Sequence, residues 1–392
     1  MPPLEGRRIW FVGIGGAGLS GYALLARAWG AEVGGWDRLE TPYLRPLAGV
    51  PLELAPEPLV PPGWQEVVVG TAWRGQVAGK SRAEFLAELV SLQPAIVVAG
   101  AHGKTTTAAM IAFCLDRLGH DPAFLIGGEI PQLRGNARAG AGWLVVEGDE
   151  SDRTIGALRP QIAVVTNVDL DHHSEFASLA EVEQLFADWA ARAPRAVWGD
   201  ELEPVDFELA LAGEHNRRNA AVALAALEVA GIPREQARHV LAGFTGAGRR
   251  LELRGEVGSV ELIDSYAHHP AELAADLAAV RNGGRLLALF QPHLYSRTRH
   301  LALEFARALT AADVVAVTEV YPAREQPLEG VSGKLIVDAL AEARPGMELA
   351  WTPAIEDGAR FLARRARAGD RILTLGAGDV ERAVPLLLEA LA

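Results

Sequence analysis

The 392-residue sequence has one cysteine, Cys114, few aromatic residues and no long apolar run. A single cysteine excludes an intrachain disulfide framework and a zinc site built from cysteines. No run reaches the roughly 18 apolar residues of a membrane-spanning helix, and the first residues lack the basic-then-apolar pattern of a secretory signal. We therefore expect a cytoplasmic protein that does not bind membranes.

Positive charge is also scarce, because 37 lysines and arginines stand against 50 aspartates and glutamates. The formal net charge of −13 argues against non-specific binding of nucleic acids, which are polyanions. Glycine contributes 41 residues and proline 23, well below the roughly 25–30% together that is typical of low-complexity chains. The length allows two or three domains with cores of their own.

Short apolar runs alternate with amphipathic stretches, which predicts an α/β fold with mostly parallel sheets. We predict strands at 8–12, 67–69, 95–99, 143–146, 162–165, 260–263, 286–290, 314–317 and 372–375, and helices at 19–29, 82–90, 105–118, 181–193 and 219–229. Breaks near 91–94 and 243–248 predict three domains, at 1–90, 91–244 and 245–392. Ligands of such sheets gather at the carboxyl ends of strands, so polar clusters that follow strands are the candidate sites.

The first cluster is G-x-G-x-x-G, formed by Gly13, Gly15 and Gly18 between a predicted strand and a predicted helix. Glycines let the backbone approach a diphosphate at a helix N-terminus. Asp37 ends the next apolar segment, where an acidic residue can hold a ribose hydroxyl. The pattern predicts a nucleotide site and leaves open a nicotinamide or flavin enzyme, or a tight turn without a ligand.

The second cluster is the segment GAHGKTTT at 100–107, which follows a predicted strand and opens a helix. Its backbone N–H groups, Lys104 and the Thr105 hydroxyl are suited to the phosphates and the Mg²⁺ of ATP. Val98 stands where a strict Walker A motif has its first glycine. We therefore predict a tighter ATP-binding turn of the form G-x-x-G-K-T-T.

Two polar segments, EGDESD at 147–152 and NVDLDHH at 167–173, end the next two predicted strands. A run of charge is commonly a solvated turn, but carboxylates at a strand end beside a phosphate loop suit Mg²⁺, which prefers oxygen ligands. His215, Asn216 and Asn219 open a later helix. Their side chains fit either a helix N-cap or contacts with an adenine edge, and the sequence leaves both open.

The last third of the chain contains GRRLE at 248–252, DSYAHHP at 264–270 and FQPHLYSRT at 290–298. The second and third of these segments follow predicted strands directly. Arginine forks bind carboxylates and phosphates, so we predict a second polar site here, with solvated loops as the alternative.

The ordered set GIGGAGLSG, GAHGKTTT, EGDESD, NVDLDHH, GEHNRRN, GRRLE, DSYAHHP and FQPHLYSRT resembles the Mur ligases. GIGGAGLSG, DSYAHHP and FQPH resemble the alanine-adding branch of this family and a related murein tripeptide ligase. The resemblance spans residues 8 to about 380. It implies three domains: a Rossmann-like domain for the UDP part of a sugar nucleotide, a central P-loop ATPase-like domain, and a C-terminal Rossmann-like domain for the amino acid.

The resemblance further implies ATP-dependent ligation of L-alanine to UDP-N-acetylmuramate through an acyl phosphate, for peptidoglycan, by a monomer or weak homodimer. It places UDP-sugar binding at Gly13, Gly15, Gly16, Ala17, Gly18, Ser20 and Asp37, and ATP binding at Gly100, Ala101, His102, Gly103, Lys104, Thr105, Thr106, His215, Asn216, Asn219 and Arg250. It places Mg²⁺ at Thr105, Glu147 and His172, and catalysis at Lys104, His268, Arg297 and His293. The alternatives are a tripeptide ligase of cell-wall recycling, a non-catalytic nucleotide-binding switch and a redox enzyme.

Two features depart from the family's pattern. The chain is shorter than usual between Phe176 and Gly213, which we interpret as a trimmed surface excursion of the central domain. Leu294 stands where many relatives have an arginine after FQPH, so we expect carboxylate recognition to depend more on Arg297.

Overall fold

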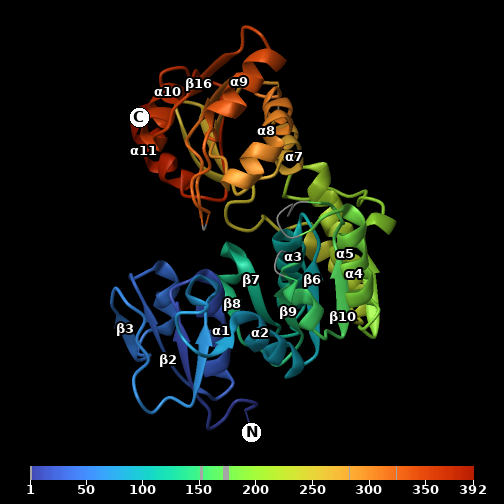
Figure 1. Cartoon of the computed structure of the whole chain (residues 1–392). Helices are drawn as coiled ribbons and strands as arrows, with labels where there is room; N and C mark the ends of the chain where they lie inside the picture. The colour runs from blue at the N-terminus through green and yellow to red at the C-terminus, as the bar shows by residue number, and fades with distance from the viewer. Residues whose placement is uncertain (1, 151–152, 171–175, 282, 324) are drawn as a thin grey trace. The chain divides into compact units, whose positions relative to one another are not determined.

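The structure is a computed structural model that describes residues 2–150, 153–170, 176–281, 283–323 and 325–392. The chain divides into two compact units, Met1–Ala210 with Arg217–Ala247 and Leu211–Asn216 with Gly248–Ala392. The described residues form three sheets, two in the first unit and one in the second (Figure 1). Three α/β sheets are the predicted fold class, whereas the predicted domain boundaries at 90/91 and 244/245 stay predictions.

The first sheet is parallel, with strand order β3-β2-β1-β4-β5. Its elements are β1 (Arg8–Val12), α1 (Ala17–Ala28), β2 (Glu32–Asp37), η1 (Pro42–Leu47), β3 (Leu52–Leu54), β4 (Glu66–Val69), η2 (Thr71–Trp73), β5 (Lys80–Ser81) and α2 (Arg82–Ser91). Alternate residues of β1 face opposite sides: Phe11 packs in one core with α1 and α2, and Trp10 packs with Trp36 on the other side. Residues outside the strands, among them Trp64 and Trp73 of η2, cover that second face.

The second sheet has strand order β11-β10-β6-β9-β7-β8 and is parallel except for the β7–β8 pair. Its strands are β6 (Ala95–Ala99), β7 (Ala123–Ile130), β8 (Gly135–Arg138), β9 (Leu144–Glu147), β10 (Ile162–Val165) and β11 (Arg195–Trp198). Its helices are α3 (Lys104–Arg117), α4 (Leu179–Ala190), α5 (Glu214–Val229) and α6 (Arg234–Leu241), with short 3₁₀ turns η3 (Pro131–Leu133), η4 (Thr154–Ala157) and η5 (Gly199–Glu201). Gly21 of α1 packs on Leu125 and Ala137, which joins the first two sheets in one unit.

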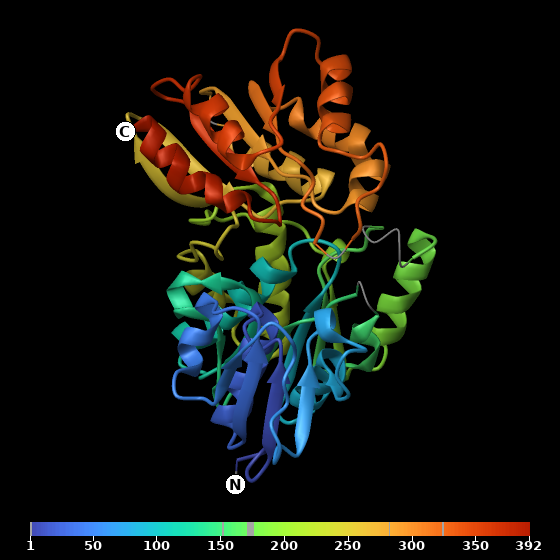
Figure 2. The ribbon, with the colours of Figure 1, turned by 60° about the vertical axis from the view of Figure 1, so that its left-hand side comes forward.

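The third sheet has strand order β12-β13-β17-β14-β15-β16, and only its β12–β13 pair is antiparallel. Its strands are β12 (Glu252–Val257), β13 (Val260–Ser265), β14 (Leu286–Phe290), β15 (Val314–Val317), β16 (Glu348–Trp351) and β17 (Arg371–Leu375). Its helices are α7 (Pro270–Val280), α8 (Tyr295–Leu309), α9 (Lys334–Ala343), α10 (Ile355–Ala363) and α11 (Ala383–Leu391), with η6 (Val380–Arg382). Helices cover both faces (Figure 2), because alternate residues of β14 enter two separate cores.

In the described part of the chain, none of the helices combines the length and the apolar character needed to cross a lipid bilayer.

Candidate functional site

The glycine-rich turn after β6 leads directly into α3, as the sequence predicts. Gly103 precedes the helix with a φ of +79°, a conformation that favours glycine. A Cβ atom at Gly103 would lie 2.2 Å from Oδ1 of Asn219, and one at Gly100 would lie 2.2 Å from Oγ1 of Thr166. The turn therefore has no room for side chains at these two positions, and Asn219 packs against it.

The segment after β10 fixes the shape of this turn. Asn167 donates from Nδ2 to the His102 carbonyl oxygen over 2.9 Å and accepts from the His102 N–H over 2.9 Å. The Asn167 carbonyl oxygen accepts from the Ala101 N–H over 3.1 Å, and Thr166 Oγ1 donates to the His102 carbonyl oxygen over 2.6 Å. The segment after β10 thus holds the glycine-rich turn in place.

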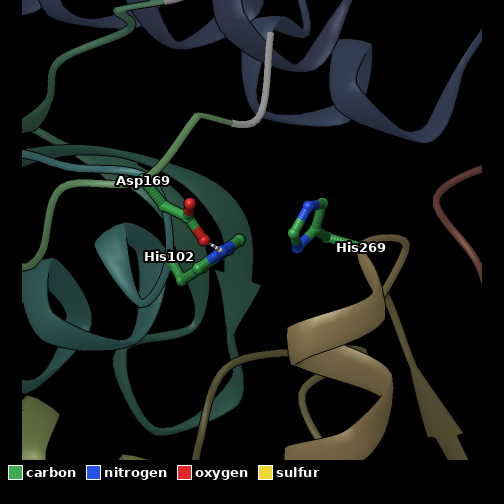
Figure 3. A group of neighbouring side chains, drawn as sticks. All are labelled: His102, Asp169 and His269. Carbon is green, nitrogen blue, oxygen red and sulfur yellow. Dashed lines mark ion pairs between the residues drawn. The ribbon is translucent and has the colours of Figure 1, made fainter. Parts of the chain in front are cut away.

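The His102 imidazole also lies near this segment. Its Nε2 is 3.6 Å from Oδ2 of Asp169 (Figure 3). Figure 3 also labels His269, which belongs to the second unit and precedes α7.

Lys104, at the start of α3, donates to the carbonyl oxygens of Gly100 and Ala101 and to Oε1 of Glu150, over 2.5, 3.2 and 2.8 Å. Glu150 is only 2% exposed. Burial works to lower the pKa of Lys104, but attraction to Glu150 and neighbouring carboxylates outweighs it and raises that pKa. Burial raises the pKa of Glu150, and the ammonium group opposes this shift. The turn thus carries a charged lysine with a buried acidic partner.

Oxygen atoms suited to a metal ion meet beside Lys104. Thr105 Oγ1 donates to Oε2 of Glu147 over 3.0 Å, and the Gly127 N–H donates to Oε1 of the same carboxylate over 2.5 Å. A hydroxyl and a carboxylate are the oxygen ligands that Mg²⁺ prefers, so this donor set fits the ion. His172, the third predicted ligand, lies outside the described residues.

The first glycine-rich turn, after β1, brings Asp37 to its backbone. Gly13 has a φ of +87°. The Gly15 N–H donates to Oδ2 of Asp37 over 2.7 Å, and Thr41 Oγ1 donates to the Gly15 carbonyl oxygen over 2.7 Å. The other carboxylate oxygen of Asp37 accepts from the Arg38 N–H over 2.7 Å.

The remaining residues predicted at this turn lie on the helix that follows it. Gly16 precedes α1, Ala17 begins it, and Gly18 and Ser20 lie in its first turns. Ser20 is buried and donates from Oγ to the Ala17 carbonyl oxygen over 3.2 Å. The structure thus gathers the predicted UDP-sugar residues around one helix N-terminus.

In the second unit, the first residues of α7 fix the conformation of the segment after β13. Pro270 is the first residue of the helix, a position where a missing N–H costs nothing. Oε2 of Glu272 accepts from the N–H groups of His268 and His269 over 3.0 and 3.3 Å. His268 Nδ1 lies 3.0 Å from the Tyr266 carbonyl oxygen. The backbone therefore fixes where the His268 ring lies.

The structure brings His268 and His293 together, although they follow different strands. Their ring centroids are 5.7 Å apart, and His293 stacks on Tyr321 at 5.7 Å with a 12° interplanar angle. The Arg250 guanidinium lies 5.2 Å from the ring centroid of Tyr266, which lies two residues before His268. The carboxyl edge of the third sheet thus collects imidazoles, phenols and a cation.

Comparisons with known proteins identify the family of this chain. Residues 98–196 match the Mur ligase middle domain, and residues 249–378 match the glutamate ligase domain of Mur ligases. The UDP-N-acetylmuramate–L-alanine ligase of Renibacterium salmoninarum is 38% identical, over 98% of this chain and 96% of the relative. The enzyme of that name from Rubrobacter xylanophilus is 37% identical, over 98% and 100%. The chain belongs to the Mur ligase family.

Solved structures of Mur ligases resemble this one over almost its whole length. UDP-N-acetylmuramate–alanine ligase from Thermotoga maritima has a TM-score of 0.80 at 25% identity, covering 97% of this chain and 98% of that one. A murein peptide ligase from Psychrobacter arcticus has a TM-score of 0.66 at 25% identity, covering 98% and 99%. The family resemblance read from the sequence is confirmed.

Three side chains of this Mur ligase that sequence reasoning missed lie at the first glycine-rich turn. A Cβ atom at Gly13 would lie 2.9 Å from Trp73, and one at Gly18 would lie 3.5 Å from the Arg82 guanidinium. The Arg38 guanidinium lies 4.3 Å from the Trp73 ring centroid. Their signal was positional, because Arg38 follows the end of β2, Trp73 lies soon after the end of β4 and Arg82 follows β5 directly.

Arg249 has a structural role that sets it apart from Arg250. Its guanidinium donates to Oδ2 of the buried Asp264 over 2.8 Å and to the carbonyl oxygens of Gly376 and Gly378 over 2.7 and 3.1 Å. These bonds hold the glycine-rich turn after β17. Arg250 is therefore the better candidate of the pair for a ligand.

Leu294 precedes α8 in this Mur ligase with a φ of +70°, in the left-handed region. Its N–H donates to the Tyr321 carbonyl oxygen over 2.9 Å. The N–H of Ser296 donates to Oε2 of Glu325 over 2.9 Å. Arg297 follows in the first turn of α8 and is 5% exposed.

Proposed function

We propose that this Mur ligase joins L-alanine to UDP-N-acetylmuramate, with conversion of ATP to ADP and phosphate, in the synthesis of peptidoglycan precursors. The observation that carries the proposal is similarity over 98% of the chain to relatives named for this reaction. We place the reaction in the cytoplasm.

The chemistry needs two transfers, and no bond to the protein. The lactyl carboxylate oxygen attacks the γ-phosphorus of ATP and ADP leaves, which gives an acyl phosphate. The amine of L-alanine then attacks the acyl carbon, loses a proton, and phosphate leaves. Positioning and charge stabilisation supply most of the catalysis in such reactions.

In this proposal the turn after β6 binds ATP. Lys104 leaves the carboxylate of Glu150, 2.8 Å away, for the β- and γ-phosphates. Asn219 packs on the turn and supports the nucleotide. Thr105 and Glu147 would hold Mg²⁺, which supplies positive charge beside the transferred phosphoryl group.

The other two sites supply the substrates. The turn after β1 binds the diphosphate of the sugar nucleotide, and Asp37 holds a ribose hydroxyl. His268 and His293 position the amino acid and the acyl phosphate, and Arg297 pairs with the amino acid's carboxylate. The support for these roles is their gathering at the carboxyl ends of β1, β13 and β14.

The test is phosphate release by the purified protein with ATP, Mg²⁺ and UDP-N-acetylmuramate. L-Alanine and L-Ala-γ-D-Glu-meso-diaminopimelate are supplied separately, with controls that lack each component. We expect release to require the sugar nucleotide and L-alanine and to match the amide formed. Release without dependence on the sugar nucleotide would reject the proposed reaction.

A murein tripeptide ligase is the second candidate, because the fold also resembles a murein peptide ligase with a TM-score of 0.66. Release that requires UDP-N-acetylmuramate together with the tripeptide, and is not stimulated by L-alanine, would favour this candidate, because a ligase with a similar fold is named for that pair of substrates.

A further inference from the structure

A buried carboxyl group lies behind the polar edge of the third sheet, and the proposed chemistry does not use it. Asp276 belongs to α7 and is 8% exposed. The Ser265 hydroxyl, at the end of β13, donates to its Oδ2. On the other side, Nε2 of His215 lies 3.6 Å from its Oδ1. One carboxyl group therefore lies between the strand that leads to His268 and the segment that carries His215.

The segment around His215 packs tightly on α7. Gly213 has a φ of +107°, and a Cβ atom there would lie 2.6 Å from Cε1 of His215 and 3.1 Å from Cβ of Ala279. The next residue, Asn216, donates from its N–H to the Gly213 carbonyl oxygen over 3.1 Å and from Nδ2 to that of Ala212 over 2.6 Å. The positions of the His215 imidazole and of Asn216 thus depend on the same turn.

We propose that Asp276 is a positioning residue of the nucleotide site: its carboxylate holds His215, and with it the turn that carries Asn216, and a proton on the carboxylate loosens that hold. The inference rests on the proposed role of His215 and Asn216 in binding ATP. Asp276 itself touches neither nucleotide nor amino acid in this proposal.

The charges around Asp276 give the direction of the effect. His215 faces it from the start of α5, Ser265 from β13, Glu272 from α7 and Arg250 from the segment before β12. Burial raises the pKa of Asp276 to about 7, and Glu272 adds to this, while Ser265 and Arg250 oppose it. Burial and Arg250 lower the pKa of His215. The charge that faces His215 therefore changes in the neutral pH range.

The experiment measures the Kd of ATP by calorimetry, and kcat by phosphate release, for the wild type and Asp276→Asn between pH 6 and 8. We expect the wild type to bind ATP at least about fivefold more weakly at pH 6 than at pH 8, in the usual range of coupling between two sites. Asp276→Asn should bind as weakly as the protonated wild type at every pH, with kcat at saturating ATP nearly unchanged.

A matched control is Asp370→Asn. Asp370 is also a buried aspartate of the second unit, 4% exposed, but it pairs with Arg285 over 3.3 Å at the start of β17, away from the carboxyl ends of the strands. This variant should keep the pH profile of the wild type. A loss of the profile in both variants would assign the effect to general loosening of the unit and overturn the inference.

The His215→Ala variant separates positioning through His215 from a merely structural role. Asp276→Asn should cost nothing further in ATP affinity when His215 is already absent, because both changes remove one interaction. Additive losses, or an unchanged pH profile in Asp276→Asn, would overturn the inference. If the wild type shows the pH-dependent Kd but releases no phosphate, the ligase reaction fails and the inference stands. If it binds no ATP, both fail.

Discussion

The first unit contains two glycine-rich turns, one after β1 and one after β6, and each joins a parallel strand to a helix. Both use a glycine with positive φ, +87° at Gly13 and +79° at Gly103. At the first turn a backbone N–H is bonded to the Asp37 carboxylate. At the second turn, Lys104 and Thr105 face carboxylates from β9 and the residues after it. The same backbone geometry therefore occurs at two turns whose neighbouring side chains differ.

The difference lies in the charge within each turn. The segment GIGGAGLSG contains no charged residue. Its backbone can bind a diphosphate, but it has no charged side chain to stabilise the charge that develops during phosphoryl transfer. The segment GAHGKTTT contributes a lysine and a hydroxyl, which we propose bind the phosphates and the Mg²⁺ of ATP. We expect changes at the second turn to act on catalysis and changes at the first to act on affinity for the sugar nucleotide.

The largest effect should come from Lys104→Ala. Losing one charge-stabilising donor typically lowers kcat by about 10²–10³-fold, while the Kd for UDP-N-acetylmuramate should stay as in the wild type. Lys80→Ala is the control, because Lys80 pairs with Glu88 over 2.6 Å in β5, outside both turns. A folded Lys104→Ala enzyme with near-normal kcat would remove the proposed difference between the turns.

Gly103→Ala should come next. The added Cβ would lie 2.2 Å from Oδ1 of Asn219, at a φ of +79°. We expect the Kd of ATP to rise about tenfold or more, since the strain of a left-handed residue alone costs roughly 1–2 kcal/mol. Gly75→Ala has a similar φ of +84° with nothing within 4 Å, so it reports strain without the clash. Equal effects of the two variants on ATP binding would contradict the packing of Asn219 on the turn.

At the first turn, Asp37→Ala should weaken binding of the sugar nucleotide about tenfold. Hydrogen bonds to a charged group contribute about 1.5–3 kcal/mol, and Asp37 accepts from two backbone N–H groups. Calorimetry with UDP-N-acetylmuramate and, separately, with ATP measures the effect. Weakened ATP binding in this variant would show that the two turns are not independent.

The sequence predicted the interior strands of the sheets well and the edge strands badly. Among the residues that the structure describes, all six edge strands were missed: β3, β5, β8, β11, β12 and β16. They are short or partly exposed, as in the three exposed residues of β3, so they lack the buried apolar run that marks an interior strand. Two interior strands, β2 and β7, were also missed, because each contains a Gly-Gly pair that interrupts its apolar run.

The candidate site could be predicted where residues of suitable chemistry directly follow predicted strands. Lys104, Thr105 and Glu147 follow predicted strands, and the fold brings them together. Contacts between distant residues left no such signal. Asp276 looks like an ordinary polar position on a helix, and only the fold brings it 3.6 Å from His215.

The smallest effect should distinguish two tryptophans of the first sheet. The ring centroids of Trp73 and Trp36 are 4.8 Å apart, and Arg38 lies over the Trp73 ring. The ring centroids of Trp64 and Trp10 are 5.0 Å apart, and Arg8 lies over the Trp64 ring.

Both rings help to cover the same face of the sheet, so replacing either by alanine should lower the free energy of unfolding by similar amounts, about 1–3 kcal/mol for such half-buried aromatic residues. Trp73 lies against the first glycine-rich turn, where a Cβ atom at Gly13 would be 2.9 Å from it. Trp73→Ala should therefore also weaken UDP-N-acetylmuramate binding about threefold, whereas Trp64→Ala should not. The expected size is that of one aromatic stacking contact, which contributes roughly 0.5–1.5 kcal/mol. Equal affinity in the two variants, measured by calorimetry, would mean that Trp73 shapes the sheet and leaves recognition to the backbone of the turn and Asp37.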